Sequence, residues 1–138
     1  MATIELENPE SWTVLIIDDD EDNREIASDT FIMFGAVVYT AENGQEGLET
    51  MKTLQPTFIL LDLSMPVMDG WQTHKALRQN PAWRHIPIIA LTAHAMVGDK
   101  ERVMEAGFDG YIGKPFRIGR VLDEVRFCLA KFVAAQTK

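Results

Sequence analysis

Four short apolar runs in the sequence each end on residues that can do chemistry. VLII is followed by Asp18 and Asp19, FILL by Asp62, IIAL by Thr92, and YIG leads through Gly113 into Lys114. Such runs are typical of buried strands, and ligands of parallel sheets gather outside the carboxyl ends of the strands. Three carboxylates, a hydroxyl and an ammonium at that edge suit a divalent metal beside a phosphorylated aspartate. The sequence therefore predicts a small phosphate-handling site.

The acidic residues after the first run have two interpretations. Residues 18–22 are all acidic, and acids are favoured in a solvated loop that leads into a helix N-terminus. This explains residues 20–22, of which Asp22 is the expected N-cap. Asp18 and Asp19 directly follow a buried strand, where two neighbouring carboxylates are unfavourable unless a cation balances them. This pair is therefore the candidate for metal binding.

An EF-hand calcium loop is a competing interpretation of the same acidic run. Aspartates at 18, 20 and 22 have the opening spacing of that loop. Asn23 stands where the loop needs a turn glycine, and Asp29 stands where it needs a glutamate. The strand-to-helix context also differs, so the EF-hand is excluded.

Each of the other three candidates has a structural alternative. Asp62 is an ordinary turn residue in that interpretation, Thr92 a strand-end residue, and Lys114 a surface charge that neutralises nearby acids. Their expected place beside the acidic pair favours chemistry instead. A hard cation such as Mg²⁺ prefers oxygen ligands, and a carboxylate can attack phosphorus to form an aspartyl-phosphate. Lys114 supplies a compact point charge suited to a phosphoryl oxygen, and Pro115 after it raises the frequency of a cis peptide bond.

The elements that carry these residues alternate along the chain. The patterns predict strands near 13–18, 36–40, 57–62, 87–92 and 109–112, and helices near 22–34, 43–53, 69–79, 97–106 and 117–133. Alternation with short connections predicts βαβ units with right-handed crossovers. The fold class is therefore α/β, a doubly wound parallel sheet of five strands with five helices.

Several residues mark the ends of these elements or their buried faces. Gly35 is expected as a left-handed cap after the first helix, and Asn43 and Asp69 as N-caps of the next two. The last helix has one apolar face at helical spacing, and Cys128 lies on it. The thiol is therefore expected in the core.

The composition is that of an ordinary globular domain, with 138 residues, 46% hydrophobic and 25% charged. Apolar runs are far shorter than the roughly 18 residues that span a bilayer, and the N-terminus lacks the features of a signal peptide. The formal net charge of −8 disfavours binding to nucleic acid or an anionic membrane, and the single cysteine fits a reducing cytosol. Residues 1–11 are expected to be a disordered extension and 135–138 a tail. His74 and His85 are expected on the surface.

Four stretches of the sequence resemble one family, the receiver domain of two-component response regulators. They are LIIDDDEDN, ILLDLSMPVMDGW, IIALTAHAM and GYIGKPF, and their order and spacing fit across residues 12–134. The resemblance implies a flavodoxin-like fold with strand order 2-1-3-4-5. It also implies a receiver that acts without an effector domain of its own.

The resemblance implies a role for each residue of the site. Asp62 is implied as the phosphoacceptor and Lys114 as the lysine that binds the phosphoryl group. Asp19 is implied as a direct Mg²⁺ ligand and Asp18 as one acting through water, with Asp62 and the backbone carbonyl of Ser64 completing the protein ligands. Mn²⁺ is an alternative cation.

The resemblance further implies residues that switch the domain and tune its hydrolysis. Thr92 is implied as the switch hydroxyl and Tyr111 as the aromatic side chain that turns inward when Thr92 moves. Ser64 and His94 occupy two positions that vary within the family and flank the phosphoryl site. They are implied to tune the hydrolysis rate, and an exposed loop histidine is the alternative for His94.

Receivers take a phosphoryl group from a phosphohistidine and are switch proteins, not enzymes, although they catalyse their own phosphorylation and dephosphorylation. The resemblance implies a sensor histidine kinase or a histidine phosphotransfer protein as donor, and a cytoplasmic location. It also implies a downstream protein target at the face of helix 97–106, strand 109–112 and helix 117–133, with no nucleic acid or membrane partner. A terminal regulator and a phosphorelay intermediate both remain open.

Three other classes of protein fit the sequence less well. A haloacid-dehalogenase-like phosphatase needs an aspartate two residues after its nucleophile, where this chain has Ser64. A flavodoxin-like flavin binder must hold a phosphate in its first loop, which residues 18–22 would repel. A degenerate receiver that serves as a phosphorylation-independent scaffold does not require the complete set of site residues found here.

Overall fold

The computed structural model describes residues 4–93, 98–114, 116–117 and 119–136. Its strands form one parallel sheet in the order β2-β1-β3-β4-β5, with β1 at Thr13–Ile17, β2 at Val37–Ala41, β3 at Phe58–Asp62, β4 at Ile88–Thr92 and β5 at Gly110–Gly113. The α-helices in these residues are α1 (Glu21–Met33), α2 (Gly44–Met51), α3 (Gly70–Gln79), α4 (Asp99–Ala106) and α5 (Val121–Gln136). The predicted fold class and strand order are confirmed.

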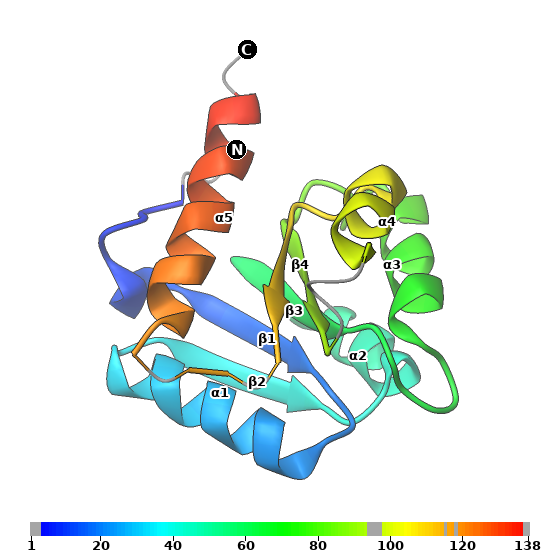
Figure 1. Ribbon diagram of the computed structural model, residues 1–138, viewed down its shortest axis with the longest axis horizontal. Coiled ribbons are helices and arrows are strands. Elements are labelled where there is room, and N and C mark those ends of the chain that lie inside the picture. The colour runs from blue at the N-terminus through cyan, green and yellow to red at the C-terminus, as the bar shows by residue number, and fades with distance from the viewer. Residues whose placement is uncertain (1–3, 94–97, 115, 118, 137–138) are drawn as a thin grey trace.

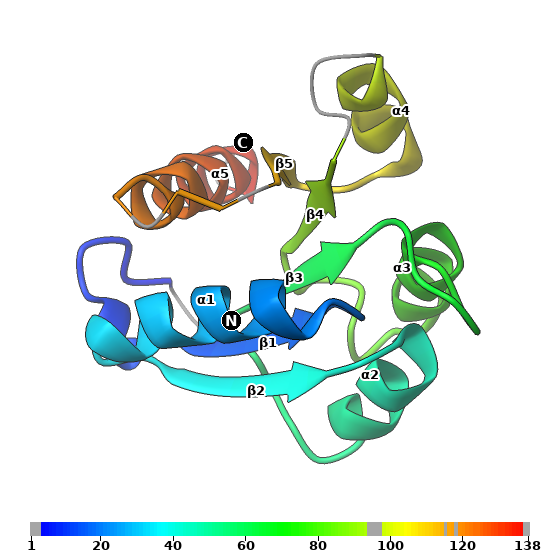
Figure 2. The same cartoon turned by 60° about the horizontal axis from the view of Figure 1, so that its bottom comes forward.

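The helices cover both faces of the sheet (Figures 1 and 2). Helices α1 and α5 pack on one face, and α2, α3 and α4 pack on the other. Every residue of β3 and β4 is buried, as expected for central strands covered on both faces, whereas the edge strand β2 is largely exposed. Among the described helices, none combines the length and apolar character that crossing a bilayer requires.

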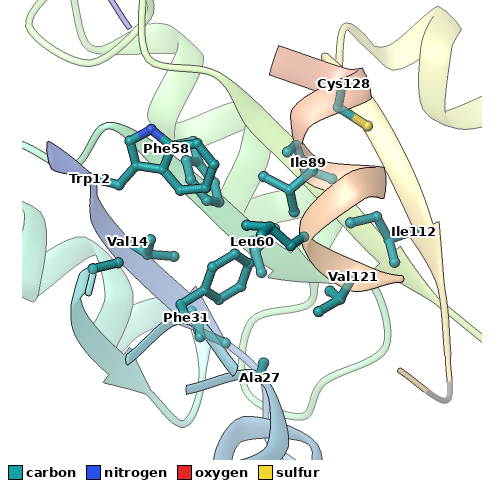
Figure 3. Packing of buried hydrophobic residues seen from close by; sticks show 14 of the residues in the cluster. Trp12, Val14, Ala27, Phe31, Phe58, Leu60, Ile89, Ile112, Val121 and Cys128 are labelled. Carbon is teal, nitrogen blue, oxygen red and sulfur yellow. The ribbon is translucent and has the colours of Figure 1, made fainter. Parts of the chain in front are cut away.

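Three aromatic side chains anchor the core beneath α1 and α5 (Figure 3). The Trp12 ring meets the Phe58 ring edge-on, with centroids 5.5 Å apart, and Phe31 meets Phe58 in the same way at 5.8 Å. Cys128 belongs to this cluster, and burial raises the pKa of its thiol to about 11. The prediction of a core thiol is confirmed.

The segment before β1 packs against the domain. The indole nitrogen of Trp12 donates a hydrogen bond to the Glu5 carbonyl at 2.9 Å, and Arg126 of α5 donates through Nε to the Leu6 carbonyl at 3.1 Å. Side chains of the segment also contact the core beneath α5. The expectation of disorder is therefore wrong for residues 4–11, because Ile4 and Leu6, the apolar side chains of this polar segment, pack against the core.

The predicted helix ends are confirmed at three positions. Gly35 follows α1 with φ of +91°, and the Asn43 side chain accepts a hydrogen bond from the amide of the third residue of α2. Asp69 forms a reciprocal capping box with Gln72 at the start of α3.

The start of α1 and both ends of α5 differ from the prediction. Asp20, not Asp22, caps α1, because the helix begins at Glu21 and the Asp20 carboxylate accepts a hydrogen bond from the Asn23 amide. Helix α5 begins at 121 and runs to 136, whereas the predicted span was 117–133. The amides of residues 120 and 121 both donate to the Arg117 carbonyl, so a hydrogen-bonded turn leads into the helix. Such a turn brings together residues three and four apart, as a helix does, which is why the sequence pattern did not separate the two.

The surface prediction for His74 is wrong. Only 4% of the residue is exposed, and its ring stacks on Phe108 with centroids 4.0 Å apart and an interplanar angle of 18°. The Trp71 ring also meets the Phe108 ring edge-on, with centroids 5.7 Å apart. Helix α3 therefore packs on the α4–β5 connection through an aromatic stack, which a polar helix sequence does not reveal. His85 is exposed, as predicted.

A half-buried ion pair joins the same two regions. Arg78 of α3 donates to Asp109 Oδ2 at 2.6 Å and also to the carbonyls of Arg84 and Ile86. The same Asp109 oxygen accepts the amide hydrogen bond of Ile88 at the start of β4. This network fixes the loops that lead into β4 and β5, and therefore the strands whose far ends carry Thr92 and Lys114.

The buried His74 gives the protein a specific acid sensitivity. Burial, reinforced by the charge of Arg78, lowers its pKa from 6.5 to about 4, although the Gly107 carbonyl acts in the opposite direction. Between these values the unfolded chain binds a proton that the folded chain does not, so falling pH favours unfolding. We expect the free energy of unfolding to fall by about 2–3 kcal/mol more in the wild type than in His74→Leu between pH 7.5 and 4.5. Denaturant titrations of both proteins measure this difference.

The matched control is His85→Leu, because His85 is exposed and should keep the wild-type pH dependence. Parallel pH profiles for the wild type and His74→Leu would contradict the burial of a neutral imidazole at this position.

Candidate metal and phosphoryl site

The sheet brings the three predicted acids together at its carboxyl edge. Strands β1 and β3 are neighbours, with Ile17 beside Leu61 in the register, so the residue after β1 and the last residue of β3 lie side by side. One carboxylate oxygen from each of Asp18, Asp19 and Asp62 lies within 4.8 Å of the others. Asp18 and Asp62 are buried and Asp19 is exposed, so the cluster opens to solvent on one side.

Lys114 reaches into this cluster from the end of β5. Its Nζ lies 3.0 Å from Asp18 Oδ2 and 3.2 Å from Asp62 Oδ2, and its side chain is 14% exposed. The Lys114 amide also donates to the Thr92 carbonyl at 2.8 Å, which ties the ends of β5 and β4 together. Thr92 is buried at that same edge. All five residues that the apolar runs singled out therefore lie at one edge of the sheet.

The charges in the cluster are strongly coupled. Burial, followed by the negative charge of Asp18, raises the pKa of the Asp62 carboxyl from 3.8 to about 7, although Lys114 acts in the opposite direction. Burial alone would lower the pKa of Lys114, but its hydrogen bond and charge interactions with Asp18 and Asp62 outweigh burial and raise that pKa. One ammonium therefore does not neutralise the buried acids.

A divalent cation fits this imbalance. The cluster offers carboxylate oxygens only, which are the ligands that Mg²⁺ prefers, and its solvent-exposed side leaves room for the waters that Mg²⁺ retains. A cation there would stabilise the ionised form of Asp62, which is the form that can act as a nucleophile. The donor set thus supports Mg²⁺ beside a reactive carboxylate.

The remaining predicted residues divide between described and undescribed positions. The Ser64 amide donates to Asp62 Oδ1 at 3.2 Å, and the Ser64 side chain is exposed beside the cluster. Tyr111 on β5 is half-buried and packs against the core beneath α2, α3 and α4. His94 and Pro115 lie outside the described residues.

The loop from β3 to α3 has an unusual backbone. Val67 has φ of +70°, which is a strained conformation for a β-branched residue. The Met68 amide donates to the Pro66 carbonyl at 2.8 Å and closes a tight turn around Val67. The capping box at Asp69 fixes the end of this loop, so the strained residue lies between two fixed points, the end of β3 and the start of α3.

Sequence reasoning missed two residues that shape the site. Gly70 begins α3, and a Cβ there would lie 2.6 Å from the Leu63 Cα and closer still to the Asp62 carbonyl. Arg24 of α1 donates through Nη1 to the Asp18 carbonyl at 2.8 Å. The only sequence signals were the Asp-Gly step for Gly70 and a single cation after five acids for Arg24, and neither specifies a tertiary contact.

Known proteins share both the sequence pattern and the fold. The response regulator receiver domain model matches residues 14–126. The chain is 34% identical to the polar-differentiation response regulator DivK of Brucella anthropi over 114 residues, which are 83% of this chain and 93% of DivK. The chemotaxis response regulator CheY4 of Vibrio cholerae superimposes with a TM-score of 0.79 and 30% identity, covering 85% of this chain and 98% of CheY4.

A further structure bears on the acidic cluster. The receiver domain of the sensor histidine kinase PA1611 from Pseudomonas aeruginosa is 27% identical, with a TM-score of 0.76, covering 88% of this chain and 98% of that domain. That domain has a magnesium ion coordinated in its active-site cleft.

The sheet order, the acidic cluster at its carboxyl edge and these matches together place the chain in the two-component signalling class. The chain belongs to the response regulator receiver domain family. Receivers of this family act as phosphoacceptor switches and bind Mg²⁺ at an acidic pocket, and this chain has the corresponding aspartate cluster.

The close approach of α3 to the site predicts the effect of a single methyl group. Gly70→Ala forces its Cβ against backbone atoms that cannot rotate away, so α3 must shift. We expect a loss of about 1–3 kcal/mol in the free energy of unfolding. Gly119→Ala is the control, because no atom lies within 4 Å of the added Cβ. Denaturant titration measures both variants, and equal stability would contradict the tight contact.

The coupling between the buried acids predicts the titration of Asp62. Asp18→Asn removes the like charge that raises the Asp62 pKa, so this pKa should fall by about one to two units. Saturating Mg²⁺ should lower it in the wild type by the same electrostatic logic. NMR of the Asp62 carboxyl carbon, assigned with Asp62→Asn, measures both shifts. A raised pKa in Asp18→Asn would show that the two carboxylates do not interact as described.

Proposed function

We propose that this receiver takes a phosphoryl group from a phosphohistidine onto Asp62 and that the resulting charge switches its protein contacts. The observation that carries the proposal is the buried Asp62 carboxylate with Lys114 Nζ at 3.2 Å and two further aspartates beside it. The donor is a sensor histidine kinase or a histidine phosphotransfer protein, as in the family, and the setting is the cytoplasm.

The proposed transfer is a direct displacement at phosphorus. An Asp62 Oδ forms the new P–O bond as the P–N bond to the donor imidazole breaks, and the imidazole leaves with the bonding electron pair. Lys114, already beside Asp62, binds a phosphoryl oxygen, and the Thr92 hydroxyl donates to another. The two residues thus stabilise the charge on the equatorial oxygens.

Asp19, Asp62 and the Ser64 carbonyl would hold Mg²⁺, with Asp18 acting through water. When bound there, the cation would supply positive charge beside the phosphoryl group. Later attack by water on phosphorus releases inorganic phosphate and restores the Asp62 carboxylate, at a rate that Ser64 and His94 tune by controlling access of that water.

The proposed output surface lies over α4, β5 and α5. Motion of Thr92 toward the phosphoryl group frees space for Tyr111 and changes this face. A groove of about 580 Å³ runs across it, and its lining includes Tyr111 together with Met104 and Phe127, which are 46% and 63% exposed. Exposed apolar side chains in a groove support a protein partner. The net charge of −8 argues against nucleic acid and anionic membrane.

The central experiment is intact mass spectrometry after incubation with acetyl phosphate, with and without Mg²⁺. We expect a gain of one phosphoryl group that requires Mg²⁺ and is absent from Asp62→Ala, because Asp62 alone supplies the nucleophile. Asp123→Asn is the control, since Asp123 is an exposed aspartate of α5 and should leave the gain intact.

If acetyl phosphate does not label the wild type, labelling by a histidine kinase or a phosphotransfer domain is measured next. Labelling by neither donor would overturn the proposal and favour a phosphorylation-independent scaffold. Return of the phosphoryl group from Asp62 to a phosphotransfer domain would identify a relay intermediate, and retention would identify a terminal regulator.

A further inference from the structure

Arg24 is a largely covered cation beside the acidic loop. It is the fourth residue of α1, and its side chain is only 14% exposed. Its Nη1 donates to the Asp18 carbonyl at 2.8 Å, and its Nη2 lies 3.5 Å from Oε1 of Glu42 in the β2–α2 turn. The guanidinium therefore joins three segments at the carboxyl edge of the sheet: the β1–α1 loop, α1 itself and the β2–α2 turn.

The Asp18 carbonyl is a sensitive point for this contact. It belongs to the peptide bond that leads into Asp19, so holding it sets the peptide plane that ends at the Asp19 Cα and restrains where the Asp19 side chain starts. The other restraints act on either side of that peptide: the Asp18 amide donates to the Ala41 carbonyl, and Asp18 Oδ1 accepts from the Asp20 amide at 2.9 Å. Asp19 is exposed, so its carboxylate is positioned by the loop backbone and not by side chains packed around it.

The charge of Arg24 and its geometry have opposite effects on a bound cation. A guanidinium near the cluster repels Mg²⁺ and on electrostatic grounds weakens its binding. Its contact with a backbone oxygen orients a ligand and thereby strengthens binding, as residues behind metal ligands commonly do. Glu42 lies beside the guanidinium and offsets part of its charge. The sign of the change on removing Arg24 therefore separates the two effects.

We propose that Arg24 is a positioning residue for the cation site, which holds the Asp18–Asp19 peptide so that the Asp19 carboxylate faces Asp62. Through Glu42 it also couples this geometry to the β2–α2 turn. The proposal rests on the proposed function, because it requires that the aspartate cluster binds Mg²⁺.

The test is the Mg²⁺ dissociation constant of the full chain, measured by isothermal titration calorimetry. Arg24→Met removes both the charge and the donors while keeping an unbranched side chain. If Arg24 positions the loop, the dissociation constant rises about tenfold. If Arg24 acts through charge alone, binding becomes tighter, and that result or an unchanged constant overturns the proposal. Arg126→Met is the matched control, because Arg126 also donates to a main-chain carbonyl but lies on α5 beside Leu6.

Two further variants keep the outcome decisive. If circular dichroism shows that Arg24→Met does not fold, Arg24→Lys is measured in its place, because it keeps the charge but loses the planar fork. A Mg²⁺ dissociation constant unchanged within twofold in Arg24→Lys then overturns the proposal.

Asp19→Asn separates the role of Arg24 from the proposed function. If Asp19→Asn loses Mg²⁺ binding while both Arg24 variants bind normally, only the role of Arg24 fails, whereas a wild type that binds no Mg²⁺ contradicts the proposed function itself.

Discussion

The packing of Asp18 and Asp62 around the ammonium of Lys114 is the interaction on which the site depends. Two buried carboxylates share one cation at distances of 3.0 and 3.2 Å, and burial together with the negative charge of Asp18 raises the pKa of Asp62 to about 7 despite Lys114. Such a cluster is unstable as an isolated feature, since burying unbalanced charge is costly. It persists because the parallel sheet places the carboxyl ends of β1, β3 and β5, which carry these three residues, at one edge.

The scaffold around the cluster is held by contacts that do not themselves belong to the site. Gly70 lets α3 lie directly against the backbone of Asp62, and Arg78 with Asp109 fixes the loops entering β4 and β5. The stack of His74 on Phe108 joins α3 to the segment after α4. These contacts tie α3 to the loops that enter β4 and β5, the strands whose far ends lead to Thr92 and Lys114.

The charge imbalance also explains how such a site can act as a switch. With no divalent cation, the raised pKa of Asp62 leaves the carboxyl partly protonated near neutral pH and thus a poor nucleophile. On the proposed function, a bound cation would restore the carboxylate, and phosphorylation of Asp62 would replace one negative group with a larger and more highly charged one beside Lys114. The proposed metal binding, nucleophile activation and conformational signal would then follow from one electrostatic arrangement.

The sequence by itself determined the element order, the parallel sheet and the residues that meet at its carboxyl edge, and the family resemblance added the strand order. Alternating apolar runs and helical patterns are local signals, and the connection rules of parallel sheets then bring Asp62 and Lys114 to one place. Only the tertiary structure decided the burial of His74, the packing of residues 4–11 and the contact of Arg24 with Asp18. These depend on which side chain a distant segment presents, and neither the periodicity nor the composition of a segment records what packs against it.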